Sequence, residues 1–316
     1  MKCSDRTTMT RRQYLATMAS DAAAFLCPHI CFSESQPIPL RVAISIATLE
    51  GANVEDARAA YRVWLAQLSR EFGLRVAVPV PEIFIPSEEL MDDVRQNTID
   101  CYGITALELA KIAAWTDPNS LVLQDDLADG LEYVLLVHNG RPYRMVRDLR
   151  GKHIVTHRAR EMVLLPAWLS LLLAVNHLPP PEEFFASNTA RDKVDEVVLP
   201  VFFGSVDAGC VARRDWEMAV ELNPQLNRDL RVLAISPKII PILFAFRIGT
   251  RAQERQVLIQ SVLRINSITA GQQIVAMYQS HGFTTRPMSV MAGTLDFVRA
   301  YDRLLLQQSG APHGKP

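Results

Sequence analysis

The sequence has few cysteines and no surplus of charge of either sign. Its 316 residues include 5 cysteines, and 33 basic residues face 34 acidic ones, for a formal net charge of -1. Binding to nucleic acid needs a basic surface that neutralises phosphates, so this balance argues against a nucleic-acid partner. No Cys-x-x-Cys motif and no His, Cys and carboxylate group at metal-ligand spacing is present, so we expect neither a metal nor another cofactor.

Signatures of catalysis and of membrane spans are also lacking. The sequence contains no Gly-x-Ser-x-Gly, no glycine-rich phosphate loop and no His-Glu-x-x-His, so no enzyme activity is predicted. A nearly unbroken apolar stretch, residues 162–175, is shorter than the roughly 20 residues that a membrane-spanning helix needs. With 49% hydrophobic residues and no repeat, the chain is long enough for two α/β lobes or one large domain.

The first 36 residues resemble an export segment of the twin-arginine type. Arg11 and Arg12 precede a weakly apolar stretch, residues 15–32, and small and polar residues follow where a peptidase could cut. We therefore predict a signal peptide over residues 1–36, although an ordinary basic N-terminal helix is the alternative. Its removal would leave Cys101 and Cys210 as the only cysteines, and we expect these two to be small buried side chains and not a disulfide.

The remaining chain alternates between strand and helix patterns, which predicts an α/β fold with parallel strands. In the first part, strands are expected at residues 40–46, 74–80 and 99–104, and helices at 54–72, from a Ser87 cap onward, and at 107–114. In such sheets the ligand lies at the carboxyl ends of the strands. Thr48 and Thr105 follow two of these strands, which makes them candidate ligand contacts.

The second part continues the alternation. Strands are expected at residues 131–138, 153–156, 184–187, 206–212 and 230–235, and helices at 162–175, 190–203 and from 213 to the Asn223-Pro224 pair. Residues 157–161 are expected to begin the first of these helices, with Pro166 inside it. A helix start offers free N–H groups to an anion. A strand at 241–247 and helices at 251–265, 270–281 and 295–305 complete the expected order.

Several sequence motifs, in the same order along the chain, resemble those of a known family. They are residues 94–103, Asp-Leu-x-Gly-Lys at 148–152, Phe-Phe-Gly-x-Val-Asp-Ala at 202–208, Glu-Leu-Asn-Pro-Gln-Leu at 221–226 and Gly-Gln-Gln-x-Val at 271–275. Together they resemble the phosphate/phosphonate ABC-transporter substrate-binding proteins. The resemblance covers roughly residues 40–305 and implies a two-lobed type II periplasmic-binding fold, with parallel-dominated sheets and a cleft between the lobes. Residues 37–130 and 233–305 would form lobe 1, residues 131–232 lobe 2, and residues 306–316 a loose tail.

The same resemblance implies a function. It predicts a periplasmic, monomeric receptor that captures a small anionic solute, such as phosphonate or a phosphate-like oxyanion, for an ABC permease. Two alternatives remain open: a receptor that signals to a membrane sensor kinase, and an enzyme on the same fold, such as a lyase or a relative that makes a pyrimidine precursor. Perturbed titratable groups in the cleft would favour the enzyme, and donors without a base would favour the receptor.

The chain departs from the family at the anion site. Where related phosphonate receptors carry Ser-Thr-Ser-Gly, this sequence has Ala159, Arg160, Glu161 and Met162, and the family's Ser-His pair falls near Lys193. Arginine and lysine could hold an anion in place of hydroxyl groups, whereas Glu161 would oppose a dianion.

The candidate ligand-binding residues are Thr48, Thr105, His157, Arg158, Arg160, Lys193 and Asp207. Each also has a structural interpretation. Arg158, Arg160 and Glu161 could form a solvated first turn with an internal ion pair. The two threonines could be helix caps, and Asp207 could hold its turn through backbone hydrogen bonds.

Overall fold

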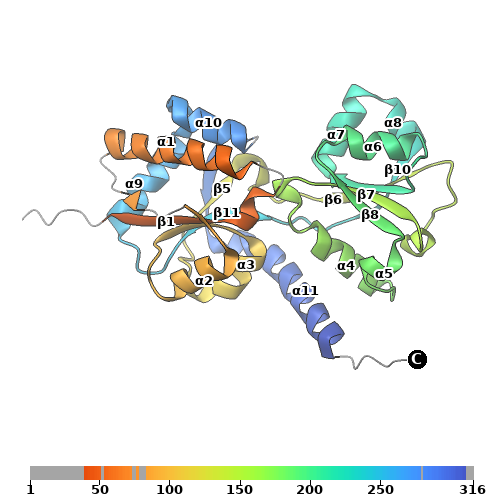
Figure 1. Ribbon diagram of the computed structural model, residues 1–316, viewed down its shortest axis with the longest axis horizontal. Helices are drawn as coiled ribbons and strands as arrows, with labels where there is room; N and C mark the ends of the chain where they lie inside the picture. The colour runs from red at the N-terminus through yellow and green to blue at the C-terminus, as the bar shows by residue number, and fades with distance from the viewer. Residues whose placement is uncertain (1–38, 51–52, 73–75, 78–82, 279, 311–316) are drawn as a thin grey trace, which may run out of the picture. The chain divides into compact units, whose positions relative to one another are not determined.

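The computed structural model describes residues 39–50, 53–72, 76–77, 83–278 and 280–310. These described residues belong to one compact unit, which contains two separate β-sheets, each covered by helices (Figure 1). The predicted export segment, residues 1–36, lies outside the described residues.

The first sheet has seven strands and combines segments from the two ends of this unit. Its members are β1 (Leu40–Ser45), β2 (Val76–Ala77), β3 (Phe84–Ile85), β4 (Cys101–Thr105), β5 (Leu121–Gln124), β11 (Ile242–Phe246) and β12 (Phe283–Arg286). Strand β1 pairs in parallel with β2, β3 and β4, whereas β11 and β12 pair antiparallel with their neighbours. The parallel half therefore brings the carboxyl ends of β1 and β4 to one edge.

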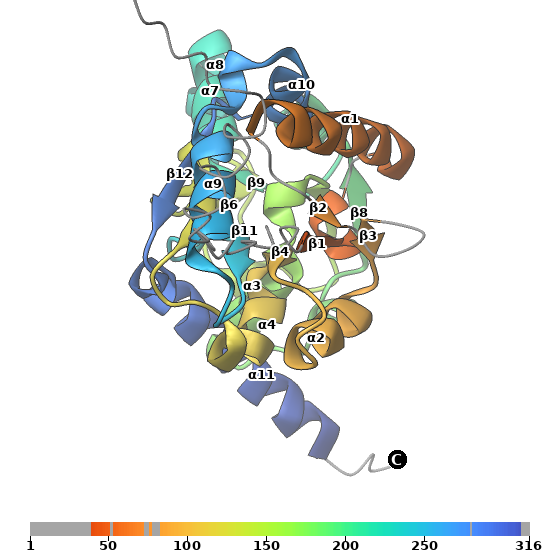
Figure 2. The same cartoon turned by 90° about the vertical axis from the view of Figure 1, so that its left-hand side faces the viewer.

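Alternation along the strands places helices on both faces of the seven-stranded sheet. Val42 and Ile44 are buried with α1 (Val54–Phe72), α9 (Ala252–Leu263) and α10 (Thr269–Met277), whereas Ala43 is buried with α2 (Ser87–Arg95) and α3 (Ala106–Ile112). Figure 2 shows α1 and α10 together on one side of this sheet and α2 on the other.

The second sheet has five strands. They are β6 (Tyr133–His138), β7 (His153–His157), β8 (Ser187–Arg191), β9 (Ala208–Ala212) and β10 (Leu230–Ile235), in the order β10-β6-β9-β7-β8. Strand β7 pairs in parallel with β8 and β9, so the chain leaves all three strands at the same edge. Val134 and Leu136 face α6 (Asp195–Phe202), α7 (Arg213–Leu222) and α8 (Gln225–Asp229), whereas Tyr133 and Leu135 face α4 (Leu165–Val175).

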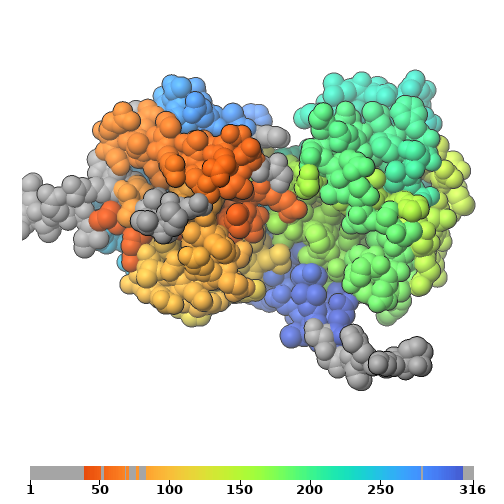
Figure 3. All heavy atoms as spheres, in the orientation of Figure 1, coloured from red at the N-terminus to blue at the C-terminus, as the bar shows by residue number. Residues whose placement is uncertain are grey.

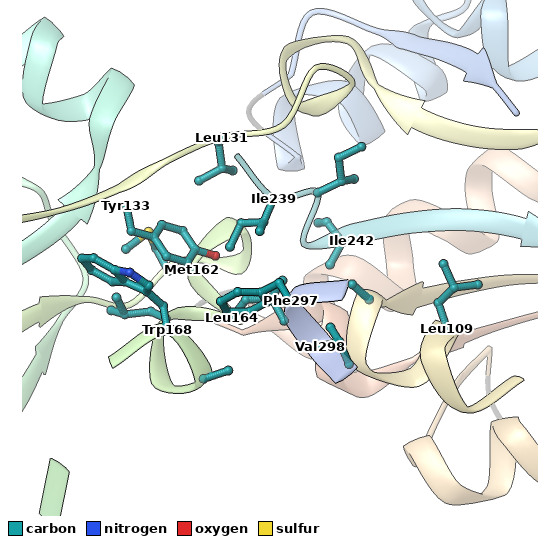
Figure 4. Packing of buried hydrophobic residues seen from close by; sticks show 14 of the residues in the cluster. Leu109, Leu131, Tyr133, Met162, Leu164, Trp168, Ile239, Ile242, Phe297 and Val298 are labelled. Carbon is teal, nitrogen blue, oxygen red and sulfur yellow. The ribbon is translucent and has the colours of Figure 1, made fainter. Parts of the chain in front are cut away.

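One hydrophobic cluster is shared by both sheets. The chain passes from β5 to β6 and returns from β10 to β11, and these two passages are tied where Leu131 and Ile239 exchange backbone hydrogen bonds of 2.9 Å each. Phe297 and Val298 of α11 (Ala292–Gly310) pack there in a cluster that also contains residues of α3 and α4 (Figure 4). Burial of this common core ties the two sheets together.

The two-sheet α/β class predicted from the sequence is confirmed, and many element bounds agree with the predictions. The helix at Val54–Phe72 matches the predicted range, and α7 ends where Asn223-Pro224 predicts. The sheets are mixed, however: parallel pairing is confined to the neighbours of β1 and β7, and the remaining pairs are antiparallel. The exact division into two lobes stays a prediction.

Several local predictions were wrong. The helix predicted to start at residues 157–161 begins at Leu165, after a short 3-10 turn at Arg160–Met162, because Pro166 has no N–H and is favoured in the first turn of a helix. Residues 181–184 are helical and 187–191 form β8, where a strand at 184–187 and a helix from 190 were expected. Helix α2 begins at Ser87 itself and has no side-chain cap.

The C-terminal helix is also longer than predicted. Helix α11 extends to Gly310, so residues 306–310 are helical and not part of a loose tail. In the described part of the chain, no helix is both long and apolar enough to cross a membrane.

Candidate functional site

A cavity of about 530 Å³ is lined by residues from both sides of the compact unit. In the space-filling view, orange atoms of the seven-stranded side and green atoms of the five-stranded side lie on either side of a recess (Figure 3). The lining residues are Glu50, Asn53, Asp56, His157, Arg158, Ala159, Arg160, Glu161, Asp192, Val194, Arg214, Asp215, Ala276 and Met277. We call the first three with Ala276 and Met277 the first wall, and the others the second wall.

The second wall forms because three strands end side by side. His157 is the last residue of β7 and residues 158–161 follow it, residues 192–194 follow β8, and Arg214 and Asp215 lie in the first turn of the helix after β9. Parallel strands deliver the segments that follow them to one edge, so residues far apart in the sequence share this wall.

Arg214 is the centre of a network of charges in the second wall. Its Nη2 lies 3.0 Å from Glu161 Oε1, its Nε lies 3.5 Å from Asp215 Oδ1, and its Nη1 pairs with Asp126. Burial lowers the pKa of Arg214, but the three carboxylates outweigh it and hold that pKa above its ordinary value. Asp126 follows β5 of the seven-stranded sheet, so this network joins the two sides.

Arg160 is a second link between the sides. Its side chain is only 8% exposed, its Nη2 donates to the carbonyl of Tyr278, and its guanidinium lies 4.0 Å from the centroid of the Tyr278 ring. Burial lowers the pKa of Arg160 below its ordinary value. Among the residues that the structure describes, no carboxylate lies within ion-pair distance of this guanidinium.

Arg158 and His157 complete the charged part of the second wall. Arg158 is exposed and pairs with Asp192 at 2.6 Å. His157 is buried, and its Nδ1 lies 3.7 Å from Asp215 Oδ2, too far for a hydrogen bond. Burial raises the pKa of the Asp215 carboxyl, which Arg214 opposes and Glu161 reinforces.

The first wall is built at the start of α1. Asn53 precedes this helix, and its Oδ1 accepts hydrogen bonds from the backbone N–H groups of Glu55 and Asp56 at 2.9 and 3.2 Å. This is the usual arrangement of an N-cap asparagine. Glu50 and Asp56 are both exposed.

Three of the seven predicted ligand contacts line the cavity, namely His157, Arg158 and Arg160. Thr48 lies on a much smaller pocket, and its hydroxyl donates to the carbonyl of Ser45 at 2.8 Å. Thr105 caps α3 in a capping box with Glu108, which is the structural alternative for this residue.

The other two candidates lie outside the cavity lining. Lys193 is exposed, with its Nζ 4.0 Å from Glu196. Asp207 precedes β9 and accepts hydrogen bonds from the Tyr143 hydroxyl and the His153 N–H, whereas the cavity is at the carboxyl end of β9. A ligand-binding role stays a prediction for all seven residues.

Five charged residues of the cavity were not selected from the sequence: Glu50, Asp56, Asp192, Arg214 and Asp215. Arg214 and Asp215 could have been found, because they follow a predicted strand in the same way as His157 does. Asp56 lies in the first turn of a predicted helix, where acidic residues are common for helix stability alone. In the described residues, no three His, Cys, Asp or Glu side chains gather in a way that could hold a metal ion.

Comparisons with known proteins agree with this architecture. The family model of the periplasmic substrate-binding proteins of phosphonate ABC transporters matches residues 46–287. A binding protein component of an ABC phosphonate transporter from Pseudomonas aeruginosa has a TM-score of 0.54 at 13% identity, covering 88% of this chain and 91% of that one.

Two further structures are similar in fold. A Xanthomonas citri protein bound to ATP has a TM-score of 0.56 at 16% identity, and PhnD1 from Prochlorococcus marinus in complex with methylphosphonate has 0.52 at 16%. Each comparison covers 84% of this chain and 98% of the other. No protein among the curated sequences matches the chain.

Proposed function

We infer the function from one premise: this chain belongs to the family of periplasmic substrate-binding proteins of phosphonate ABC transporters. We propose that it is a receptor that encloses a small solute between its two sheets and presents it to an ABC permease, and that it catalyses no reaction. The observation that carries the proposal is the cavity of about 530 Å³, lined by both sides of the compact unit. This volume lies in the usual range for small-molecule sites, about 300–1,000 Å³.

An oxyanion such as a phosphonate or phosphate-like group is our candidate for one end of this solute. Arg158 reaches the cavity from an exposed position, and Arg160 lines it without a carboxylate partner in the described chain. Guanidinium groups form charge-assisted, often bidentate, bonds with such anions. These two arginines replace the hydroxyl groups that similar receptors use.

Binding is tested by measuring thermal stabilisation and then calorimetric affinity with phosphate, phosphite, methylphosphonate, ethanesulfonate and acetate. At least one oxyanion is expected to bind, and Arg160→Gln is expected to weaken it by about 2–5 kcal/mol, since a buried charged contact is lost. Arg150→Gln is the matched control, because Arg150 is exposed and lies over the Phe184 ring, away from the cavity lining. Binding of neutral solutes alone, or an affinity unchanged in Arg160→Gln, would contradict the assignment.

We further propose that the receptor reaches the periplasm through the twin-arginine segment and acts there as a monomer. Changing Arg11 and Arg12 to lysine is expected to leave the precursor in the cytoplasm. N-terminal sequencing of the exported protein is expected to find a first residue between about 33 and 39. An intact Met1 in the exported protein would overturn this part of the proposal.

A further inference from the structure

The end of the five-stranded sheet opposite the cavity has an excess of basic side chains. The loop between β6 and β7, residues 139–152, contains one carboxylate, Asp148, and five basic residues: Arg141, Arg144, Arg147, Arg150 and Lys152. Since β6 runs antiparallel to β9, whose carboxyl end is at the cavity, this loop lies at the far end of the sheet (Figure 1). Two more arginines, Arg228 and Arg231, lie beside the loop, because Leu230 pairs with His138 at the end of β6. We call these seven basic residues the basic end.

The two ends of this sheet differ in how their positive charges are neutralised. At the cavity end, Arg158, Arg213 and Arg214 all form ion pairs with carboxylates. Among the residues that the structure describes, no carboxylate lies within ion-pair distance of any member of the basic end. Two carboxylates at this end are held by neutral groups instead: Asp148 accepts from two backbone N–H groups, and Asp207 accepts from a tyrosine hydroxyl and a backbone N–H.

Three members of the basic end have a contact that serves the fold. Arg141 donates to the Gly204 carbonyl at 2.9 Å. Arg150 and Lys152 lie over aromatic rings, 5.7 and 5.9 Å from the ring centroids. These contacts account for where the three side chains lie, but they bring no opposite charge.

The other four members are Arg144, Arg147, Arg228 and Arg231, and their guanidinium groups form no hydrogen bond or ion pair within the described chain. Two nitrogen atoms of Arg231, Nε and Nη2, are buried and have no acceptor. Burial lowers the pKa of Arg231, and the positive charge of Arg144 lowers it further. Guanidinium groups that repel one another and lack acceptors gain free energy when an anionic surface approaches them.

Exposed apolar side chains lie at the same end. Met145, between two of the loop arginines in the sequence, is 49% exposed, and Phe203 is 74% exposed. Phe203 belongs to this end because α6 starts beside the cavity and finishes here, where the adjacent Gly204 binds Arg141. A free oxyanion makes no use of such side chains. An anionic bilayer offers phosphate groups to the arginines and an acyl boundary to the apolar side chains.

We propose that the basic end is a docking surface for an anionic phospholipid bilayer, with its arginines on the headgroup phosphates and Met145 and Phe203 at the acyl boundary. The surface and the cavity occupy opposite ends of the five-stranded sheet, so the inference does not depend on which solute the cavity takes. Docking of this kind leaves the cavity free and concentrates the proposed receptor at the membrane that holds its permease.

The experiment measures co-sedimentation of the full chain with lipid vesicles. Vesicles of phosphatidylcholine alone are compared with vesicles that also contain about 30% phosphatidylglycerol. Binding to the anionic vesicles is expected at about 50 mM NaCl and is expected to weaken tenfold or more at about 500 mM, because salt screens the arginines. No binding to the anionic vesicles, or equal binding to both kinds, overturns the inference.

Variants locate the binding surface and separate it from any binding by residues 1–36. Combined substitution of Arg144→Gln, Arg147→Gln and Arg228→Gln is expected to weaken binding by about a hundredfold, since each arginine is worth about fivefold near an anionic surface. None of the three lines the cavity, so solute affinity is expected to stay unchanged.

The matched control changes the same number of exposed arginines elsewhere: Arg62→Gln, Arg264→Gln and Arg303→Gln. Its affinity for the anionic vesicles is expected to stay within about twofold of the wild type. Circular dichroism checks that both combined variants are folded. An equal loss in the control would mean that the vesicles sense only net charge, which overturns the assignment to the basic end.

A further variant tests the commitment to lipid. Met145→Ser with Phe203→Ser is expected to weaken vesicle binding about tenfold, because apolar area no longer enters the interface. Unchanged vesicle binding in this variant, together with equally tight binding of soluble polyglutamate, assigns the basic end to an acidic protein and overturns the proposal. Release from the vesicles by inorganic phosphate, but not by NaCl of the same ionic strength, assigns it to a free oxyanion and overturns it too.

Discussion

The two walls of the cavity satisfy their charges in opposite ways. In the second wall, Glu161 and Arg160 are each 8% exposed, and Arg214 ties two of the wall's carboxylates together. In the first wall, Glu50 and Asp56 are exposed and have no basic partner in the described chain. The network around Arg214 has all its partners within the protein, so it is organised before a ligand binds. The two carboxylates of the first wall are instead hydrated. The second wall is therefore held in place by its own ion pairs, whereas the carboxylates of the first wall remain in contact with solvent.

The largest effect is expected where the support of the first wall is broken. A Cβ at Gly271 would lie 2.0 Å from the carbonyl oxygen of Ile265, so Gly271→Ala forces α10 away from the turn before it. We expect the free energy of unfolding to fall by about 3 kcal/mol or more, as for severe overpacking. Urea denaturation measures this change.

Gly293→Ala is the control for that substitution. A Cβ at Gly293 meets nothing within 4 Å, and this glycine is exposed near the start of α11. The free energy of unfolding of Gly293→Ala is expected to stay the same or rise slightly, since alanine favours the helix. Equal stability of the two variants would mean that the close approach of Gly271 to Ile265 does not restrict α10.

A smaller effect is expected from opening the network of the second wall. Arg214→Gln leaves Glu161, Asp215 and Asp126 without their common partner. We expect the free energy of unfolding to fall by about 2 kcal/mol, which is less than for a fully buried pair because Arg214 is partly exposed. Arg158→Gln breaks only the exposed pair with Asp192 and is expected to cost less than about 0.5 kcal/mol. Thermal denaturation compares the two, and similar losses would remove the contrast between buried and exposed pairs.

Loss of the cap at α3 is expected to cost about 1 kcal/mol. The Thr105 side chain accepts from the Glu108 N–H, and Glu108 returns the contact to the Thr105 N–H at 2.7 Å. Thr105→Ala is therefore expected to lower stability without changing solute affinity, whereas Thr105→Ser keeps both. An affinity loss beyond the change in stability would restore Thr105 as a ligand contact.

The smallest expected effect is the change in folding stability with pH that Asp215 and Asp100 cause. Burial raises the pKa of Asp215 above its ordinary value, so the folded state holds a proton more tightly than the unfolded one. The stability from this group is present at low pH and is lost as the pH rises through the folded pKa. Burial alone would also raise the pKa of Asp100, but the hydrogen bonds and charge of Arg41 outweigh it and lower that pKa. The stability from Asp100 is therefore present above its unfolded pKa and is lost as the pH falls.

Two variants separate these contributions. As the pH rises above about 4, the free energy of unfolding of Asp215→Asn is expected to increase relative to that of the wild type. As the pH rises through the acid range, the free energy of unfolding of Asp100→Asn is expected to decrease relative to that of the wild type. Urea denaturation at a series of pH values measures both differences. Differences of the same sign would show that one of the two carboxyl groups has been assigned the wrong environment.

The sequence predicted elements wherever a local signal marks them. The apolar spacing of α1 and the Asn223-Pro224 pair after α7 define those helices without help from the rest of the chain. Strands β5 and β12 were missed, because both are short and are held by pairing with each other. Pairing between distant segments leaves little trace in a short stretch of sequence.

The candidate site was predictable only in part, for a similar reason. His157 and Arg160 were found because they follow a recognisable strand. The contact between Arg160 and Tyr278 joins residues 118 positions apart, and that between Arg214 and Asp126 joins residues 88 apart. Such pairs depend on how the two sheets meet, which no local pattern in a single sequence specifies.

The shared core has a consequence for the order in which the chain can fold during synthesis. The cluster that unites the two sheets draws on α3, on Tyr133 and Trp168, and on Phe297 and Val298 of the final helix. Domains that emerge early from the ribosome usually fold as they appear. Here the five-stranded sheet can pair once β10 has emerged, but its joint with the other sheet stays open until α11 has been made. Completion of the cavity therefore waits for α11, and a chain shortened before α11 would leave the apolar surface at this joint exposed.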